Sequence, residues 1–357
     1  MTEPDLLRRW PGNPLITPEQ LRPSRLDWKV DCAFNAGVVQ AGDETIMLLR
    51  VAESVAQVGD ETICVPLLEA DGEAWRCTIK TLRLDDPDYD FADPRMISLR
   101  ADPSQVYLTS LSHLRLARSG NGTDFAVDET PFLFPDTRYE RFGCEDARLT
   151  AIEGRYYINY TAVSDYGIAT ALAVTDDFRE VERLGLIFSP DNRDVCLFPR
   201  RIGGHHWCLH RPAPKHLGTP DIWIARSPDL LHWGHHQRLA GAVPGGWEAS
   251  KIGGGAQMLE TDRGWLQIYH GVDTDQRYSL GALLLDLDDP RIVRARLATP
   301  LARPVEEYEV TGFFGNVLFS CGAVIHGDEL RVYYGAADRV MALGTVALPD
   351  LWAAMGV

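Results

Sequence analysis

Short segments rich in β-branched and aromatic residues recur along the chain, and one pattern among them repeats about every fifty residues. Three copies each combine small residues, a polar turn and an aromatic residue; they are Ala117–Phe125, Ala173–Phe178 and Ala225–Trp233. Related apolar segments stand about one interval downstream, at Leu283–Leu287, and upstream, at Leu48–Val51. A period of about 50 residues in a strand-rich chain favours a β-propeller, whose ligands bind where the inner strands converge. The chain is long enough for about five four-stranded blades.

Individual segments also favour an all-β fold. Tyr156–Tyr160, Trp265–Tyr269 and Leu330–Tyr334 have the composition of strands, and each follows a turn signal, as in antiparallel hairpins. We expect no long amphipathic helix except near the two ends of the chain. A β-sandwich, in which the repeat would arise by chance, is the alternative architecture.

The charge balance limits the partners of such a protein. The 357 residues carry a formal net charge of −16, and 45% of them are hydrophobic, as in a globular protein with a large core. Nucleic acids and anionic membranes select basic surfaces, so we expect neither as a partner, and assembly into a homo-oligomer is left open. A site for an anionic ligand must therefore gather its cations locally.

Targeting signals and a redox pattern are not apparent in the sequence. Met1–Asp5 lacks the basic and apolar regions of a signal peptide, and no apolar stretch reaches the roughly 20 residues of a membrane span. The expected location is therefore the cytoplasm. The seven cysteines are scattered without CxxC spacing, so we expect reduced thiols rather than disulfides or zinc ligands.

Polar and charged residues are dense inside the predicted strands and at their ends. Burying a charge is costly unless it is paired or bound to a ligand, so such a concentration indicates a site. The segments concerned are Phe34–Val38, Leu49–Glu53, Gly143–Arg148, Asn192–Asp194, Leu209–Pro212, Ser250–Gly255, Tyr269–Gly271 and Gly335–Asp338.

The ionisable residues of these segments fall into two chemical groups. The carboxylates are Glu145, Asp146 and Asp338; the cations are Arg148, Arg193, Arg211 and Lys251, with His270 as a further donor. A glycosidase needs two working carboxylates, one as the acid and one as the base or nucleophile. A phosphorolytic enzyme needs only the acid, because phosphate is the nucleophile and is held by planar arginine donors and a lysine charge.

Simpler interpretations apply to single residues. Arg148 and Asp146 could form a plain ion pair, and the histidine pairs His205–His206 and His235–His236 are expected in surface loops, without a metal-ligand pattern. Gly253–Gly255 lacks the Walker spacing and the following Lys-Ser/Thr of a phosphate loop. We therefore expect no metal site and no Walker-type nucleotide site.

The motifs resemble those of glycoside hydrolase family 130, the β-mannoside phosphorylases, over almost the whole chain. They occur in the order found in the family: Gly12–Thr17, Phe34–Gly37, Leu49–Val51, Glu145–Arg148, Leu197–Pro199, His210–Pro212, Gly264–Leu266, Tyr269–Gly271 and Tyr334–Asp338. Chance agreement across so many separated motifs is improbable. The resemblance implies a five-bladed β-propeller, and a single catalytic domain over residues 1–357 with short terminal extensions.

The resemblance also implies roles for particular residues. Asp146 is similar to the proton donor of the family, in a motif usually written Glu-Asp-Pro-Arg, in which Ala147 here replaces the proline. The implied phosphate-binding set is Arg193, Arg211, Lys251 and His270, and the implied sugar-binding set is Asn35, Arg50, Glu145, Arg148 and Asp338. The role of Asp194 is left open.

Residues near 54–109 resemble an insertion. It contains a second Asp-Pro-Arg, Asp93–Arg95, which we reject as the catalytic motif because Ser110–Ser119, Tyr139–Glu140 and Gly143 lead into Asp146 as they do in the family. The insertion and Tyr107–Ser112 resemble the branch that acts on β-1,2-mannobiose and short β-1,2-oligomannosides.

The resemblance implies an inverting phosphorylase, a β-mannoside:phosphate mannosyltransferase that needs no cofactor and uses inorganic phosphate as a co-substrate. Phosphate would attack the anomeric carbon to give α-mannose 1-phosphate while Asp146 protonates the leaving oxygen, in this family through a sugar hydroxyl. One alternative is a β-mannosidase on the same scaffold, in which a carboxylate such as Glu248 activates water. Others are a phosphorylase for β-1,4-mannosyl-glucose or mannooligosaccharides, and a non-catalytic carbohydrate-binding propeller, which would have no use for the cations.

Overall fold

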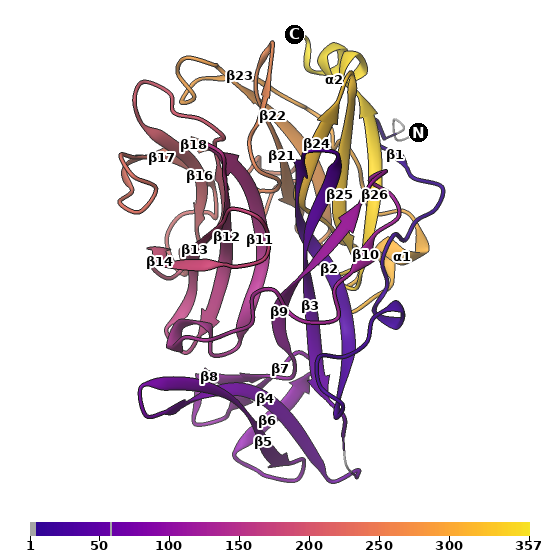
Figure 1. The fold of residues 1–357 in the computed structure, drawn as a ribbon, viewed down its shortest axis with the longest axis vertical. Coiled ribbons are helices and arrows are strands. Elements are labelled where there is room, and N and C mark those ends of the chain that lie inside the picture. Colours follow the sequence, from indigo (N-terminus) through magenta and orange to yellow (C-terminus); the bar gives the residue numbers. More distant parts are fainter. Residues whose placement is uncertain (1–4, 58) are drawn as a thin grey trace.

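Strands dominate the protein and confirm the all-β prediction (Figure 1). The computed structural model describes residues 5–57 and 59–357. Met1–Pro4, on which the signal-peptide prediction partly rests, lie outside the described residues. The three segments predicted as strands, Tyr156–Tyr160, Trp265–Tyr269 and Leu330–Tyr334, lie within β12, β21 and β25.

Four sheets form the main body. The first has the order β1 (Arg8–Arg9), β26 (Val340–Ala347), β25 (Glu329–Ala336) and β24 (Leu318–His326). The second has the order β14 (Glu182–Phe188), β13 (Gly167–Thr175), β12 (Arg155–Ser164), β11 (Gly143–Ile152), β9 (Leu111–Ser119), β3 (Glu44–Val55) and β2 (Trp28–Ala41), with β10 (Ala126–Val127) paired to β9. The third has the order β15 (Asn192–Leu197), β16 (His206–Pro212), β17 (Ile222–Ser227) and β18 (Gly234–Ala240). The fourth has the order β19 (Lys251–Gly254), β21 (Gly264–Val272), β22 (Tyr278–Leu285) and β23 (Val293–Arg296), with β20 (Leu259–Thr261) paired to β21.

The sequence repeat has a structural counterpart. Its three copies fall on β9, β13 and β17 and the downstream segment on β22, each the third strand of an antiparallel group, whereas the upstream segment Leu48–Val51 falls on β3, the second strand of its group. The large sheet consists of two such groups, because β9 and β11 are joined by a single parallel pairing between Ser112 and Gly143. Within each group the strands are antiparallel, as the turn signals indicate. The number of propeller blades stays a prediction.

Helices are short. The α-helices are α1 (Glu307–Val310) and α2 (Leu348–Met355), and the 3-10 turns are η1 (Pro18–Gln20) and η2 (Arg138–Glu140). Helices were allowed only near the two ends of the chain: α2 lies near the C-terminal end, where it packs Leu351 and Trp352 against the core, and the only helical element among the described residues before β2 is the turn η1. No helix of the described residues is long and apolar enough to cross a lipid bilayer.

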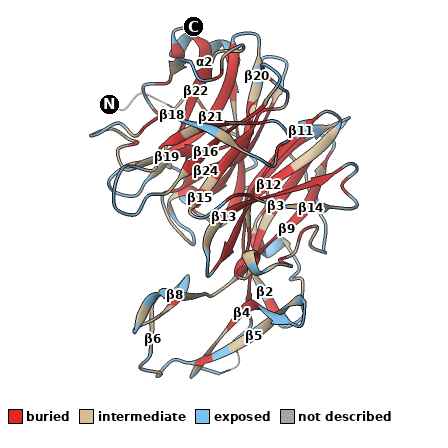
Figure 2. Cartoon of the chain, turned by 90° about the vertical axis from the view of Figure 1, so that its left-hand side faces the viewer, coloured by how far each residue is buried: buried red, intermediate tan, exposed pale blue. Residues whose placement is uncertain are grey.

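The segment between β3 and β9 forms two small sheets of its own. β4 (Thr62–Asp71) pairs with β5 (Ala74–Arg83), and β7 (Met96–Leu99) lies between β6 (Tyr89–Asp93) and β8 (Asp102–Leu108). These strands project from one end of the molecule, opposite the termini and α2 (Figures 1 and 2). In Figure 2 their residues are largely intermediate or exposed, whereas the main sheets are largely buried.

The core lies between the sheets. β21 is buried along its whole length, so both of its faces are covered by protein. Its polar residues Gln267 and His270, at 0% and 1% exposure, therefore need partners inside the molecule. The prediction of histidines in surface loops is wrong here: His206 is buried in β16, which begins at that residue, and His235 and His236 are exposed but lie in β18.

Candidate active site

Irregular backbone conformations set the direction of four polar side chains. Asn35, Asp146 and Asp194 have φ values of 48°, 48° and 56°, and each lies where the register of β2, β11 or β15 shifts at a bulge. Asp338, with φ 50°, lies in the turn between β25 and β26. Asparagine and aspartate tolerate this left-handed conformation better than other side chains, and bulges re-aim side chains beside active sites. The local sequence thus turns four polar side chains out of the regular strand pattern.

These residues line one cavity of about 320 Å³, which we call the central cavity. Of the ten predicted site residues, nine line it: Asn35, Arg50, Glu145, Asp146, Arg193, Arg211, Lys251, His270 and Asp338. They come from different sheets, which the sequence order alone could not show. Arg148 lies behind the cavity wall, where its guanidinium donates to the carbonyl oxygens of Asp146, Gly254 and Gly255 at 2.8–3.0 Å.

One wall of the central cavity carries several carboxylates, and Arg50 binds two of them. Arg50 donates from Nη2 to Glu145 at 2.7 Å and from Nη1 to Asp146 Oδ1 at 2.9 Å. Asn35 Nδ2 donates to the same Asp146 oxygen at 3.0 Å. The Arg50 guanidinium also stacks over Phe34, 4.5 Å from the ring centroid. Asp146 is therefore fixed in direction, with Oδ2 not engaged by these donors.

Two carboxyl groups on this wall have raised pKa values. Burial is the main cause that raises the pKa of Asp338 to about 7; the charges of Asp146 and Glu145 contribute to the rise, and Arg50 opposes it. Burial also raises the pKa of Glu145, which Arg50 lowers and Asp146 raises. Asp338 and Glu145 therefore keep a proton more readily near neutral pH than ordinary carboxyl groups do.

The opposite wall is organised by Asp194. Its carboxylate accepts from Arg211 Nε at 2.5 Å and lies 3.4 Å from Arg148 Nη2 and 3.5 Å from His270 Nε2. Burial alone would raise the pKa of Asp194, but Arg211, His270 and Arg148 outweigh burial and hold it well below its usual value. One buried anion therefore positions three basic side chains.

Two arginines face each other across neighbouring strands on this wall. Arg193 in β15 is the register partner of Arg211 in β16. Like charges placed directly opposite are unfavourable unless an anion separates them. Among the residues that the structure describes, Arg193 Nε is buried without a hydrogen-bond partner. The pair is therefore suited to bind an oxyanion that comes from outside the protein.

Lys251 and His270 extend the basic wall. Lys251 Nζ donates to the Tyr278 hydroxyl at 2.6 Å. Burial lowers the pKa of Lys251 to about 8, and Arg211 and Arg193 lower it further. Burial also lowers the pKa of His270 to about 3, against the opposing effect of Asp194, so His270 is a neutral donor at neutral pH.

The glycines after Lys251 make room for this wall. A Cβ atom on Gly253 would lie 2.3 Å from Asp194 Oδ2 and 2.6 Å from the His270 ring. As predicted from spacing, this glycine run is not a Walker phosphate loop; its function here is close approach of the backbone to buried side chains.

The sequence interpretation left several cavity residues without a role. Asp194 was noted but not assigned, and Arg95, Tyr278, Phe313 and Phe319 were not proposed, although all four line the central cavity. Aspartate inside a predicted strand next to an arginine was the available signal for Asp194. The aromatic residues and Arg95 gave no local signal, because their approach depends on distant turns.

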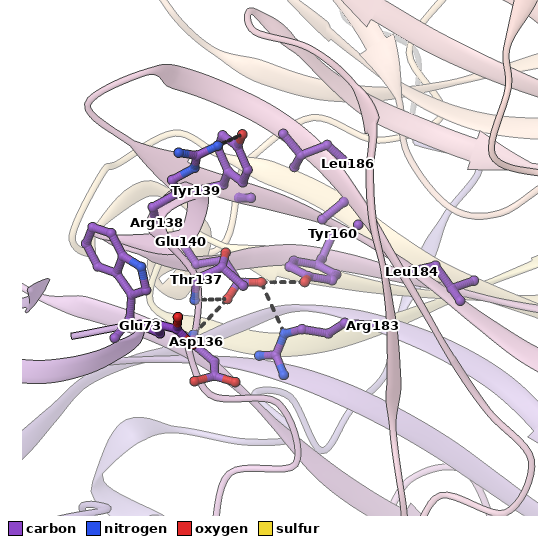
Figure 3. Close-up of a pocket in the computed structure, with 14 residues that line it drawn as sticks. Glu73, Asp136, Thr137, Arg138, Tyr139, Glu140, Tyr160, Arg183, Leu184 and Leu186 are labelled. Carbon is purple, nitrogen blue, oxygen red and sulfur yellow. Dashed lines mark hydrogen bonds and ion pairs between the residues drawn. The ribbon is translucent and has the colours of Figure 1, made fainter. Parts of the chain in front are cut away.

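A larger cavity, of about 670 Å³, lies between the β4–β5 hairpin and the sheet that contains β12 to β14; we call it the hairpin cavity (Figure 3). Its buried carboxylate, Glu140, accepts from the Tyr160 hydroxyl at 2.5 Å and from the backbone N–H groups of Asp136 and Thr137 at 2.8 and 3.2 Å. Arg183 Nε lies 3.4 Å from the same carboxylate. The buried carboxylate of the hairpin cavity therefore has its hydrogen-bond partners within the protein.

Two further observations concern alternative chemistry. Glu248, the candidate base for hydrolysis, does not line the central cavity; it accepts from Tyr269 at 2.7 Å and lies 2.6 Å from Arg296. Within residues 5–57 and 59–357, no group of three or more His, Cys, Asp or Glu side chains has the arrangement of a metal site.

An all-β scaffold with carboxylates on one wall of a cavity and a pair of facing arginines on the other defines a class of protein that holds a polyhydroxylated ligand beside an oxyanion. The chain belongs to glycoside hydrolase family 130, whose model, described as β-1,4-mannooligosaccharide phosphorylase, matches residues 94–355.

Individual relatives agree with this membership. A β-1,2-mannobiose phosphorylase from Listeria innocua is 47% identical over 335 residues, which are 94% of each chain. A 1,2-β-oligomannan phosphorylase from Thermoanaerobacter sp. is 37% identical over 70% of this chain and 83% of its own length. The solved structure of the Listeria innocua β-1,2-mannobiose phosphorylase in complex with β-1,2-mannobiose superposes with a TM-score of 0.92 over 98% of this chain and 99% of that one, at 45% identity.

Proposed function

We propose that this enzyme cleaves β-1,2-mannobiose or short β-1,2-oligomannosides with inorganic phosphate, releasing α-mannose 1-phosphate. The observation that carries the proposal is the basic wall of the central cavity, where Arg193 and Arg211 face each other and Arg193 Nε is without a partner in the described part of the chain. Phosphate would separate the two guanidinium groups and accept from both. The identity of 47% to a β-1,2-mannobiose phosphorylase supports the choice of linkage.

The carboxylate wall would hold the mannosyl unit and supply the acid. Asn35, Arg50, Glu145 and Asp338 would bind sugar hydroxyls, and Asp146 would deliver the proton to the leaving oxygen, through a sugar hydroxyl as in the family. Arg148, behind the wall, would act by holding the Asp146 backbone and Asp194 in place.

The reaction then proceeds as one displacement. A phosphate oxygen attacks the anomeric carbon, the bond from that carbon to the glycosidic oxygen breaks, and the leaving oxygen takes the proton. Inversion follows because the nucleophile and the leaving oxygen occupy opposite faces of the sugar. The cations hold phosphate in a preorganised, largely buried setting. There they stabilise the charge that develops in the transition state more strongly than water would.

We also propose the arrangement that carries the site. The five antiparallel groups of strands would be the blades of a single propeller domain spanning the chain, with residues near 54–109 as an insertion. This proposal is supported by the repeat on β9, β13, β17 and β22 and by the convergence of residues from separate sheets on one cavity.

The test is the phosphate dependence of β-1,2-mannobiose cleavage. We expect mannose 1-phosphate, identified by phosphorus and proton NMR as the α anomer, only when phosphate is present. Release of free mannose at the same rate with and without phosphate would instead establish hydrolysis. Supplying mannose 1-phosphate with mannose and determining the linkage of the product decides between β-1,2 and β-1,4 chemistry.

A further inference from the structure

The insertion contributes directly to the wall of the central cavity. Its strands pair only with one another, yet Arg95, from the turn between β6 and β7, and Leu108, from the end of β8, both line the cavity. Phe313, from the segment after α1, lines the same cavity and is 40% exposed. The catalytic scaffold and the insertion therefore meet at this edge of the cavity.

Arg95 is held in a fixed direction there. Its Nε and Nη2 donate to the two oxygens of Asp93 at 3.0 and 2.8 Å, and its guanidinium lies over Phe314, 5.1 Å from the ring centroid. Hydrogen bonding to Asp93 is the main cause that raises the pKa of Arg95, and the charge of Asp338 contributes. No partner for Nη1 is found in residues 5–57 and 59–357, which leaves donors available to a ligand.

We propose that Arg95 and Phe313 bind the sugar that leaves, so that the insertion sets the preference of the enzyme for its acceptor. The inference rests on the proposed function. In an inverting displacement the leaving oxygen lies on the face of the sugar opposite the phosphate, so the leaving sugar points away from Arg193 and Arg211. Arg95 offers N–H donors to its hydroxyl groups, and Phe313 offers an apolar ring to its C–H face.

A second cavity adjoins the central cavity at Phe313. This cavity, of about 480 Å³, is lined by Pro94, Phe313, Lys29 and Thr109 among others. It shares Phe313 with the central cavity, and its Pro94 precedes Arg95. A leaving group of more than one mannosyl unit therefore has a path across Phe313, so the subsite accepts the end of an oligosaccharide as well as a single sugar.

A purely structural role for Arg95 is the competing explanation, and the chain contains a matched control for it. Arg83 makes the same bidentate contact, to Asp85 two residues away, at 2.9 and 2.7 Å in the same insertion. Arg83 does not line the central cavity. Arg83→Ala removes an equivalent ion pair without removing a cavity donor.

The experiment measures both directions of the reaction for the wild type, Arg95→Ala, Arg95→Lys and Arg83→Ala. With mannose 1-phosphate as the donor, we expect Arg95→Ala to raise the KM for the acceptor by about tenfold or more, as for the loss of a charged hydrogen bond. The KM for mannose 1-phosphate and that for phosphate should stay within about twofold of wild type, since the basic wall is intact. Arg95→Lys should recover part of the acceptor affinity, and Arg83→Ala should leave every KM unchanged.

Three results would overturn the inference. They are an unchanged acceptor KM in Arg95→Ala, an equal rise in the phosphate KM, and an equal effect of Arg83→Ala. Thermal midpoints of the four proteins separate an effect on binding from one on folding. A purely structural role would lower the midpoint in proportion to the loss of acceptor affinity. Wild-type protein that produces no mannose 1-phosphate would refute the proposed function itself, which distinguishes that failure from a failure of the inference.

Discussion

The central cavity and the hairpin cavity differ in how their charged groups are used. The hairpin cavity is the larger, at about 670 Å³ against 320 Å³, but its buried carboxylate Glu140 is satisfied by Tyr160 and by backbone donors. In the central cavity, Arg193 Nε, Asn35 Oδ1 and His270 Nδ1 are buried without partners in the described part of the chain.

This difference supports the central cavity as the proposed active site better than size does. A buried polar group without a partner is costly, and a ligand in the central cavity would supply contacts for these atoms. In the hairpin cavity the partners of Glu140 belong to the main body, where they tie η2 to β12 and β14. The buried carboxylate of the hairpin cavity therefore has its partners already, whereas the central cavity keeps donors and acceptors for a ligand.

The largest expected effect on turnover comes from replacing the acidic residue of each cavity in turn. Asp146→Asn should lower the turnover of β-1,2-mannobiose by about 1,000-fold in both directions, because it removes the proton donor while keeping a side chain that Arg50 and Asn35 can contact. Initial rates of phosphorolysis and of synthesis measure the loss. Binding of the disaccharide, followed by calorimetry, should change little.

Residual turnover within about tenfold of wild type would exclude Asp146 as the acid. The corresponding control in the other cavity is Glu140→Gln. It should leave turnover intact and lower the thermal midpoint, because Glu140 has hydrogen-bond partners but no reacting ligand.

The next effect compares one arginine from each cavity. Arg193→Ala should raise the KM for phosphate by about 10- to 100-fold, since a charge-assisted contact is lost. Arg183→Ala, which removes the partner of Glu140 and the donor to Phe134 O, should leave that KM unchanged and cost about 2 kcal/mol of unfolding free energy. Steady-state kinetics at varied phosphate and denaturant unfolding measure the two quantities.

Equal phosphate KM values for Arg193→Ala and Arg183→Ala would remove the distinction between the two cavities. A rise in KM for Arg183→Ala alone would reverse it and would move the anion site to the hairpin cavity.

The smallest effect is a pH dependence confined to the central cavity. The pKa of Lys251 is lowered to about 8, chiefly by burial, so Lys251 is charged below that pH and loses its charge above it. The kcat/KM for phosphate should therefore fall by about tenfold as the pH rises from about 7 to about 9. Lys251→Arg, which stays charged, should remove this fall.

Lys251 affects stability in the opposite sense. Its pKa in the folded state is below its unfolded value, so the folded state binds fewer protons between about pH 8 and the ordinary lysine pKa of 10.5. The contribution of Lys251 to the free energy of unfolding should rise across that window, in which phosphate affinity falls. A pH profile in which both quantities move together would contradict the assignment.

Much of the site could be predicted from single residues. Asn35 and Asp146 stand out as polar residues inside strands and Asp338 as one at a strand end, and the order of the motifs along the chain then suggested their roles. The repeat predicted an all-β fold, since it samples the third strand of successive groups. These inferences needed local patterns and their order, not contacts between distant segments.

Other residues could not be placed from sequence. The direction of Arg148, toward backbone carbonyls rather than into the cavity, depends on the bulge in β11 and on Gly254 and Gly255, more than a hundred residues away. Arg95 lies on a turn whose motif we rejected as the acid, and its approach to the cavity depends on how the insertion folds back. Such long-range placement has no local signature.

The left-handed residues at the bulges have a consequence for how this site can change. Each bulge sets the backbone direction of one polar side chain, and hydrogen bonds to neighbours such as Arg50 and Arg211 then fix its head group. An exchange between asparagine and aspartate at Asn35 or Asp194 keeps a residue that tolerates the left-handed backbone but changes the charge that its neighbours meet; a β-branched residue there would strain the strand itself. The scaffold thus restricts these positions to few side chains, and a change of charge at one of them alters its partners as well.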